Sequence, residues 1–458
     1  MSAPGIDPLV RAPVPPADVL IRDARVLDPR AGHDGRHDVL VRGGEIAQIG
    51  EAGGIEAPAG AEVVEARGRD LFPAFVDPHV HLRTPGQEYK EDLETGTRAA
   101  AAGGFCCVVA MPNTDPVVDS ASVLRSLRDA AARDARVPVG FMPAITKGLD
   151  GLELTEMAEL RAGGALGFTD DGRPVVSAGM LRRALQYQRL CGGVLALHEE
   201  DPALSAGGAM HEGRVSALLG VAGIPSISES SMVARDAEIA GYEDGRVHMQ
   251  HLSCVASVDA VAAAKASGWK VTAEASPHHL CLTEEAVRGL DTRMKMNPPL
   301  RTETDRQALI EGLRCGVIDC VATDHAPHAR DEKEVPFEQA PMGTTGLETS
   351  YAVLHTELVL PGVLDLATLI ERMTAGAALL GLPTPRILPG EPANLCLVDP
   401  AAEWVVGEDG YESRSENCSF AGRTLHGRVL LTIAAGAVAY RERGFAVSAA
   451  PEPEGAGA

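Results

Sequence analysis

The chain has 458 residues, a formal net charge of -23 at pH 7 and a sequence pI near 5.0. This negative charge argues against a nucleic-acid or acidic-membrane partner, because the phosphates of either would repel the protein. Hydrophobic residues make up 45% of the chain, which is enough for a sizeable core. No apolar stretch approaches the roughly 18 residues of a membrane span. The composition therefore predicts a cytoplasmic protein without a membrane segment.

Short β-rich runs, joined by Gly, Asp and Pro turns, occupy both ends of the chain. They cover residues 19–27, 38–42, 45–49, 394–400 and 429–440. We predict that residues 17–70 and 386–445 pair into one small β-sandwich domain. Residues 1–16 form a proline-rich lead-in, and residues 446–458 are rich in Pro, Glu, Gly and Ala, so both tails are expected to be disordered.

Between these ends, apolar runs alternate with Ala-rich helical segments such as residues 119–133 and 181–190. Alternating strands and helices are typical of an α/β protein with a parallel sheet. A (β/α)8 barrel needs about 250 or more residues, which fits the length available. We therefore predict a TIM-like barrel over residues 71–385, inserted into the small β domain.

The strand-like stretch over residues 72–83 ends an apolar run with two histidines one residue apart. Alternate side chains of a strand share a face, so His79 and His81 point the same way and can hold one divalent metal. Arg83 is two residues further along and therefore points to the same side as the two histidines. A histidine pair of this kind can also be a coincidence on an exposed strand, and Arg83 could belong to a surface ion pair.

Four further runs end in potential ligands. Asp170 and Asp171 follow residues 165–169, His198 follows 193–197, His251 follows 247–250, and Asp324 and His325 follow 317–323. A lone residue of this kind is more often a cap or a structural residue. Because four runs end in such residues and follow a strand with a histidine pair, the sequence instead predicts a metal centre at one rim of the barrel. Imidazoles and carboxylates without thiolates suit catalytic zinc, manganese or cobalt.

The nine cysteines do not form a CxxC pattern. Cys106 and Cys107 are adjacent within an apolar run, and the others are scattered. They are interpreted as buried or incidental thiols of a protein in a reducing cytosol.

The order of these motifs resembles the amidohydrolase superfamily and, within it, closely resembles the class I dihydroorotases. The matching motifs are residues 77–86, 110–114, 168–172, 210–213, 276–280, 295–301 and 322–328. The resemblance spans residues 19–441, nearly the whole chain. It implies a metallo-barrel that acts on a cyclic amide carrying a carboxylate.

The resemblance implies one or two Zn²⁺ ions per subunit. The implied ligands are His79, His81, Asp171, His198, His251 and Asp324. Many superfamily members bridge their metals with a carboxylated lysine, whereas class I dihydroorotases place an aspartate there. Residues 165–172 contain no lysine, so a carboxylate is expected to bridge. Family spacing favours Asp171, and Asp170 is expected to hold the loop through backbone hydrogen bonds.

The implied reaction is the reversible cyclisation of N-carbamoyl-L-aspartate to L-dihydroorotate in pyrimidine biosynthesis. Asp324 is expected to be both ligand and catalytic acid or base. Arg83 is expected to bind the substrate carboxylate with Asn113 and His328, while Asn297 and the backbone of Met342 and Gly343 read the ring amide.

Three histidines, His278, His279 and His325, are predicted to be structural or to support the ligands. Residues 325–333 run into a charged stretch that is expected to form a loop over the mouth of the barrel and to deliver His328. For Asn113 and Asn297, simple turn formation is an alternative, because both lie in segments that contain proline.

Two positions depart from the family pattern. Thr84 stands where an acidic residue is usual, and Met342 stands where a phenylalanine is common. Neither residue is a predicted ligand. Met342 keeps an apolar contact but loses the flat ring, so substrate affinity or loop order could differ from the family norm.

Two alternative functions stay open at this point. The first is another cyclic amidase, a hydantoinase or an allantoinase. The second is a dihydroorotase that works only with an aspartate carbamoyltransferase partner or serves that partner as a noncatalytic scaffold. The resemblance also implies a homodimer.

Overall fold

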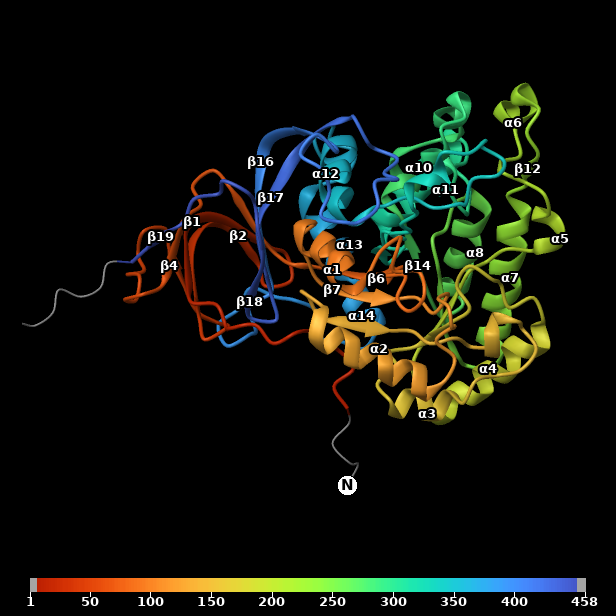
Figure 1. Cartoon of the computed structure of the whole chain (residues 1–458), viewed down its shortest axis with the longest axis horizontal. Coiled ribbons are helices and arrows are strands. Elements are labelled where there is room, and N and C mark those ends of the chain that lie inside the picture. The colour runs from red at the N-terminus through yellow and green to blue at the C-terminus, as the bar shows by residue number, and fades with distance from the viewer. Residues whose placement is uncertain (1–5, 451–458) are drawn as a thin grey trace, which may run out of the picture.

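The protein is described by a computed structural model, which covers residues 6–450. Figure 1 shows two units side by side: a β-rich unit coloured red and blue, formed from both chain ends, and a larger unit of strands and helices. The two ends of the chain therefore meet in one unit, and the middle of the chain builds the other.

The β unit contains nine strands. They are β1 (Val19–Asp28), β2 (His33–Arg42), β3 (Glu45–Glu51), β4 (Glu62–Glu65), β5 (Asp70–Pro73), β16 (Leu395–Val405), β17 (Thr424–Ala434), β18 (Ala437–Arg441) and β19 (Ser448–Ala449). Their order is β18-β17-β16-β5-β1-β2-β3, with β4 lying between β1 and β19 on a branch. The strands enclose an apolar cluster that includes Ile21, Val41, Leu71 and Ile433.

This unit is one branched sheet, whereas the sequence predicts a sandwich of two sheets. The branch arises within β1, whose first half pairs with β4 and whose second half pairs with β5. Between Ile21 and Ala24 the register with β2 shifts, and Asp23 there has a φ of 60°. A bulge of this kind bends a strand and changes its partner, which an alternating pattern does not reveal.

Both predicted disordered tails are ordered where the structure describes them. The amide of Val10 donates to the Val139 carbonyl at 3.0 Å, and the amide of Ala12 donates to the Ala135 carbonyl at 3.0 Å. At the other end, β19 pairs with β4. The prediction is therefore wrong for residues 6–16 and 446–450, because strand edges offer these segments backbone partners. Residues 1–5 and 451–458 lie outside the described residues.

The larger unit has eight parallel barrel strands. They are β6 (Phe75–Val80), β7 (Phe105–Ala110), β8 (Val139–Phe141), β9 (Phe168–Thr169), β10 (Leu195–Leu197), β13 (Arg246–Met249), β14 (Lys270–Ala275) and β15 (Cys320–Val321). Three strands and five strands form two hydrogen-bonded groups. The groups join where the Leu166 amide donates to Phe141 at 3.0 Å and where the His81 amide donates to His325 at 2.9 Å. The eight strands therefore close into the predicted barrel.

One principal helix follows each barrel strand. These helices are α1 (Leu93–Ala102), α2 (Ala121–Asp134), α3 (Met157–Ala162), α4 (Ala178–Cys191), α7 (Ile227–Tyr242), α8 (Val255–Ala266), α10 (Glu303–Cys315) and α13 (Leu366–Thr374). The predicted helices at residues 119–133 and 181–190 are confirmed as α2 and α4. Capping boxes start α1 at Asp92 and α10 at Thr302.

Shorter elements lie in the connections between these strands and helices. They are α5 (Pro202–Ser205), β11 (Met210–His211), α6 (Arg214–Leu219), β12 (Gly223–Ile224), α9 (Pro277–Cys281), α11 (Arg330–Lys333), α12 (Ser350–Leu354), α14 (Gly376–Leu379), the 3-10 helices Lys147–Leu149, Glu284–Gly289, Thr292–Met294 and Leu347–Thr349, and the π-helix His355–Val359. Residues 200–226, between β10 and α7, form the excursion that carries α5 and α6 at one edge of the molecule (Figure 1).

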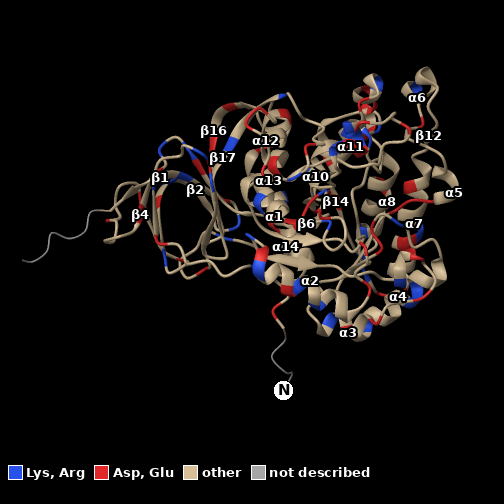
Figure 2. Cartoon of the chain, in the orientation of Figure 1, with Lys and Arg blue, Asp and Glu red and all other residues tan. Residues whose placement is uncertain are grey.

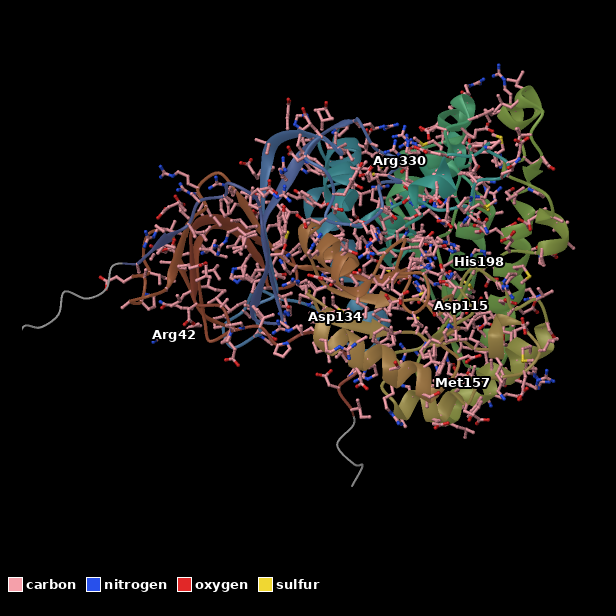
Figure 3. The ribbon with its side chains drawn as sticks, in the orientation of Figure 1. Arg42, Asp115, Asp134, Met157, His198 and Arg330 are labelled. Carbon is pink, nitrogen blue, oxygen red and sulfur yellow. The ribbon has the colours of Figure 1, made fainter. Side chains whose placement is uncertain are left out.

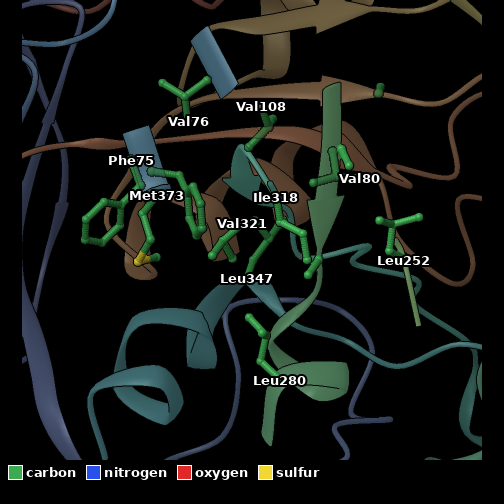
Figure 4. Close-up of a cluster of buried hydrophobic side chains, with 14 of the residues drawn as sticks. Phe75, Val76, Val80, Val108, Leu252, Leu280, Ile318, Val321, Leu347 and Met373 are labelled. Carbon is green, nitrogen blue, oxygen red and sulfur yellow. The ribbon is translucent and has the colours of Figure 1, made fainter. Parts of the chain in front are cut away.

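The barrel strands are buried on both faces, as in other parallel sheets covered by helices. All six residues of β7 are buried. Figure 4 shows the shared core, which contains Val80 from β6, Val108 from β7 and Val321 from β15 and, beside Phe75, Met373 of α13. Acidic and basic residues both occur on the outer helices (Figure 2). Within residues 6–450, none of the helices has the length and apolar character needed to cross a bilayer.

Candidate metal centre

The six predicted metal ligands come from five strands and lie at or just beyond their carboxyl ends. His79 is in β6 and His81 follows it, while Asp171, His198, His251 and Asp324 follow β9, β10, β13 and β15. Every one of them is 7% exposed or less. Figure 3 places His198 inside the barrel unit, far from Arg42 on the β unit. The fold therefore gathers side chains that are up to 245 positions apart in sequence, from 79 to 324.

The first half of the centre lies between β6 and the two aspartates. His79 Nε2 is 3.3 Å from Asp171 Oδ1 and 3.5 Å from Asp324 Oδ1. His81 Nε2 is 3.4 Å from Asp171 Oδ2 and 3.1 Å from Asp324 Oδ1. Two imidazole nitrogens and two carboxylates thus converge on one small space.

The second half shares Asp171 with the first. Its Oδ1 is 3.8 Å from His198 Nδ1 and 3.7 Å from His251 Nε2. The ligand atoms of the two trios, His79–His81–Asp171 and Asp171–His198–His251, lie within 4.8 Å of one another in each trio. Asp171 belongs to both trios, so its carboxylate lies between the two pairs of imidazoles.

The donor set fits a divalent metal. His79 is 0% exposed, yet its Nε2 has no hydrogen-bond partner within the described residues. An orphaned polar atom in a buried site costs free energy, and a cation that accepts its lone pair removes that cost. Nitrogen and oxygen donors at this spacing are those of catalytic zinc and related metals.

The electrostatics of the site keep the carboxylates charged. Burial alone would raise the pKa of Asp324, but His79, His81 and His251 hold it below its ordinary value. Burial likewise acts to raise the pKa of Asp171. The effect of His79 and His251 is larger, so the pKa of Asp171 lies well below its ordinary value. Both side chains are therefore anionic ligands over the physiological pH range.

Three residues of the site have left-handed backbone conformations. The φ angles are 57° at Arg83, 30° at His251 and 47° at Asp324. Each costs of order 1–3 kcal/mol for a side chain with a Cβ atom. The barrel framework offsets this cost and thereby turns the side chains at the strand ends toward the centre.

Glu274, in β14, supports the ligands and was missed by the sequence analysis. Its Oε1 accepts a hydrogen bond from His79 Nδ1 at 2.6 Å, and its Oε2 is 2.9 Å from His248 Nε2. Burial acts to raise the pKa of Glu274, but His79 and His248 lower it to about 2. The charged carboxylate fixes the proton of His79 on Nδ1 and leaves Nε2 free for a metal. An acidic residue in an apolar strand, as in Ala273-Glu274-Ala275, was the available signal.

Substituting Glu274 by Gln is expected to weaken metal binding by about 10- to 100-fold, because Gln cannot hold the proton on His79 Nδ1 as a carboxylate does. Titration of the purified protein with a competing chelator, followed by metal analysis, measures this change. The exposed Glu238 of α7 gives a matched control, Glu238→Gln. Equal metal retention in both variants would contradict the role of Glu274.

Asn113 and Asp170 lie beside the ligands. Asn113 Oδ1 accepts from His81 Nδ1 at 2.9 Å, which orients the second imidazole of the pair. Its Nδ2 is 3.5 Å from Asp171 Oδ2. Asp170 accepts hydrogen bonds from the amides of Ile145 at 2.8 Å and Thr146 at 3.0 Å, so it ties the loop after β9 to the chain after β8.

A second acidic residue, Glu200, was also missed. Its Oε2 is 3.0 Å from His198 Nε2 and accepts from Asn297 Nδ2 at 2.7 Å. Burial acts to raise the pKa of Glu200, but contact with His198 lowers it to about 2. Glu200 therefore directs His198 Nδ1 toward Asp171. Asn297, predicted to read the substrate ring, is held by Glu200 through its amide nitrogen.

Comparison with known proteins identifies the family. A family model described as dihydro-orotase-like matches residues 68–257. The chain is 46% identical over 426 residues to a dihydroorotase of Pelotomaculum thermopropionicum and 47% identical over 433 residues to one of Anaeromyxobacter dehalogenans, in both cases covering 93% of this chain and 99% of the relative. The chain belongs to the dihydroorotase family.

The fold extends to related enzymes. A solved structure titled L-hydantoinase (dihydropyrimidinase) from Arthrobacter aurescens is similar with a TM-score of 0.81 and 26% identity, covering 92% of this chain and 96% of that chain. The predicted resemblance to dihydroorotases and the barrel architecture are both confirmed.

Arg83 is buried beside the centre of this dihydroorotase-family protein, with 8% exposure. Its Nε donates to the Pro327 carbonyl at 3.1 Å, while within the described residues its two terminal nitrogens make no hydrogen bond. Burial lowers the pKa of Arg83, and the nearby Asp324 and Asp171 oppose that effect. The guanidinium end is thus a buried cation with unused donors.

His328 is 6% exposed and lies on the segment that follows Asp324. Its Nε2 donates to the Met342 carbonyl at 2.8 Å, and its Nδ1 has no hydrogen-bond partner within the described residues. Burial and the charge of Arg83 lower the pKa of His328 to about 2, so the ring is neutral. In this tautomer the free Nδ1 is an acceptor, whereas the sequence analysis expected a donor to the substrate carboxylate.

The backbone at Met342 and Gly343 is already engaged. The Gly343 amide donates to Lys295 at 2.9 Å, and the Gly343 carbonyl accepts from Asn417 Nδ2 at 3.1 Å. The Gly343 N–H therefore has a protein partner in this structure, and the role of this backbone in reading the ring amide stays a prediction. Gly343 is required here, because its φ is 134° and a Cβ atom would lie 2.7 Å from the Ala326 Cβ.

The three remaining histidines are hydrogen-bonded within the protein. His325 Nδ1 accepts from the Gly346 amide at 3.2 Å, and Ser276 Oγ lies 2.9 Å from His278 Nε2 and 2.6 Å from His279 Nδ1. The structure does not bring these rings into either ligand trio. Their geometry agrees with a supporting position.

Residues 325–333 are anchored more firmly than a charged stretch suggests. Lys333 is only 8% exposed and donates to the carbonyls of Thr292 at 3.0 Å and Pro341 at 2.8 Å. Burial lowers its pKa to about 7. Glu332 pairs with Lys90 at 2.9 Å. The segment thus lies between the loops around residues 90, 292 and 341, rather than projecting into solvent.

Proposed function

We propose that this protein catalyses the reversible ring closure of N-carbamoyl-L-aspartate to L-dihydroorotate, a step of pyrimidine biosynthesis. Relatives named dihydroorotase are 43–47% identical to it over most of the chain. The observation that carries the proposal is the buried guanidinium of Arg83 beside the metal ligands, with its terminal donors unused.

A buried cation with free donors predicts an anionic ligand. Leaving the charge unpaired is costly, and a carboxylate can accept two parallel hydrogen bonds from one guanidinium. Both L-dihydroorotate and N-carbamoyl-L-aspartate carry a carboxylate that takes no part in the bond changes. Arg83 can thus orient either one with its amide carbonyl toward the ligands.

The metal is proposed to be zinc, with one or two ions per subunit. His79, His81, Asp171 and Asp324 would hold one ion, and Asp171, His198 and His251 would hold the second. When bound, zinc supplies Lewis-acid polarisation of the amide carbonyl and lowers the pKa of water toward about 7.

Asp324 is proposed to move the proton. In ring opening its carboxylate accepts a proton from the attacking water as the new C–O bond forms. The ring C–N bond then breaks, and Asp324 donates the same proton to the departing nitrogen. Ring closure follows the reverse order. Because neighbouring histidines hold the pKa of Asp324 low, its carboxylate is unprotonated at the start of each ring opening.

The alternative cyclic amidases fit the site less well. The segment 165–172 supplies Asp171 and no lysine, whereas a carboxylated lysine would need one there. Hydantoin itself carries no carboxylate to pair with Arg83. The likeness to an L-hydantoinase structure is explained by the shared barrel and β unit.

The remaining parts of the proposal concern assembly and location. We propose a homodimer in the cytoplasm, with aspartate carbamoyltransferase as a candidate partner. All nine cysteines are free and six of them are buried, in keeping with a reducing compartment. Activity of the purified chain with and without the transferase separates an independent enzyme from a partner-dependent one.

Removing the metal is expected to abolish turnover of L-dihydroorotate. The purified protein is treated with a chelator, assayed by the loss of ring absorbance, and assayed again after stepwise addition of zinc. Recovery that saturates near one or near two ions per subunit gives the number of ions the reaction needs. Full activity after verified metal removal would contradict a metal-dependent mechanism.

A further inference from the structure

The connection between β16 and β17 leaves the β unit and reaches the rim of the barrel. The Arg414 amide donates to Glu91 at 3.2 Å, and Ser415 Oγ donates to the Lys90 carbonyl at 2.6 Å. Further along, Cys418 forms a parallel bridge with Thr345. In Figure 1 this blue connection extends from β16 and β17 over the barrel unit. A segment from the C-terminal part of the chain thus contacts the loops that surround the metal centre.

Asn417 lies on this connection and contacts the loops that carry His328 and Gly343. It is 5% exposed. Its Oδ1 accepts from the His328 amide at 3.0 Å, and its Nδ2 donates to the carbonyls of Ala326 at 3.0 Å and Gly343 at 3.1 Å. One donor and two acceptors surround the amide, so its orientation is defined: a flipped amide would place its oxygen against two carbonyls.

These three side-chain hydrogen bonds join two loops, and the backbone of the same connection also contacts the second loop, where the Thr344 hydroxyl donates to the Asn417 carbonyl at 3.1 Å. The first carries Ala326 to His328, and its Pro327 carbonyl accepts from Arg83. The second carries Gly343, whose neighbour Met342 accepts from His328 Nε2. Asn417 therefore adds three hydrogen bonds to those that join the two loops directly, such as the bond from the Ala326 amide to the Thr344 carbonyl at 2.9 Å, and it holds the backbone on both sides of Pro327.

We propose that Asn417 is a positioning residue for substrate binding, by which the β unit holds the carboxylate-binding side of the centre in place. The inference rests on the proposed function, which assigns the substrate carboxylate to Arg83, the residue that donates to the Pro327 carbonyl. Asn417 does not contact the six metal ligands, so its effect is on the geometry of substrate binding and leaves metal binding intact.

The test compares Asn417→Ala with Ser419→Ala. Ser419 lies on the same segment with 2% exposure, and its Oγ has no hydrogen-bond partner within the described residues. Asn417→Ala is expected to raise KM for L-dihydroorotate by about 10-fold or more, with kcat changed less than about 3-fold, because ground-state and transition-state binding fall together. Ser419→Ala is expected to behave as the unchanged protein. Metal content is expected to be equal in all three.

A double-mutant cycle separates positioning from general stability. If Asn417 acts through His328, the double variant is expected to have nearly the same KM as His328→Ala. If the two residues act independently, the free-energy changes of the two substitutions add. Additive effects, or a fall in kcat that follows loss of metal, would overturn the proposal. Should Asn417→Ala not fold, Asn417→Ser keeps a hydroxyl for one of the three groups and is expected to give a smaller KM increase.

Hydrogen exchange tests the same inference without a substrate. Peptides that cover residues 324–345 are expected to exchange faster in Asn417→Ala than in Ser419→Ala, because the His328 amide loses its acceptor. Unchanged exchange there would overturn the positioning role. Absence of dihydroorotate turnover by the unsubstituted protein would instead refute the proposed function, and the exchange result would still decide whether Asn417 holds the two loops.

Discussion

Replacing Asp324 with Asn is expected to lower kcat for both ring opening and ring closure by about 10²- to 10⁴-fold, the contribution typical of a positioned acid or base. Asn is close to Asp in size but cannot accept the proton of the attacking water. His81 Nε2, which lies 3.1 Å from Asp324 Oδ1, would face a neutral amide in its place. Steady-state rates in both directions measure the change.

Metal content distinguishes loss of the base from loss of a ligand. Asp324→Asn protein is analysed for bound zinc and assayed in zinc excess. Retained metal with low kcat supports proton transfer by Asp324, while recovery of the full rate in excess zinc would show that Asp324 serves only to bind metal. An unchanged kcat would remove Asp324 from the mechanism.

Replacing Arg83 with Met is expected to lower kcat/KM for L-dihydroorotate by about 10²-fold or more. Each hydrogen bond to a charged group contributes roughly 1.5–3 kcal/mol, and about 1.4 kcal/mol corresponds to a factor of ten. Arg83→Lys keeps the charge but loses the planar fork, so partial activity is expected. Initial rates over a range of substrate concentrations give the effect.

The exposed Arg42 on the β unit provides the control, Arg42→Met, which is expected to leave kcat/KM unchanged. The compound 5,6-dihydrouracil has the same ring as L-dihydroorotate but lacks the carboxylate. Arg83→Met is also expected to reduce the ratio of the kcat/KM values for L-dihydroorotate and 5,6-dihydrouracil. A loss of equal size for both rings would show that Arg83 has a role other than carboxylate recognition.

Much of the fold was predictable from the sequence because its signals are local. The apolar run of β7 and the helical pattern of α2 are each contained in one short segment, and alternation of such segments indicates a barrel. The six candidate ligands could be placed near one another for the same reason, since they lie at or just beyond the ends of five strands. Their convergence follows from the rule that carboxyl ends of parallel strands share one rim.

The parts that were missed depend on neighbours distant in sequence. Glu274 contacts His79 across 195 positions, and Asn417 contacts His328 across 89 positions. An acidic residue within an apolar strand marks Glu274 as unusual, but the local pattern does not show which residue either side chain contacts. The branched sheet depends on a bulge at Asp23, and the order of residues 6–16 depends on the free edge at Val139. Tertiary partners decided each of these features.

The most direct test of the carboxylate-specific metal site is a side-by-side assay of L-dihydroorotate and 5,6-dihydrouracil with zinc-loaded protein. The account predicts rapid ring opening of L-dihydroorotate and a kcat/KM for 5,6-dihydrouracil that is lower by about 10²-fold or more, because only the former can pair with Arg83. Equal or preferred turnover of 5,6-dihydrouracil or hydantoin would contradict it.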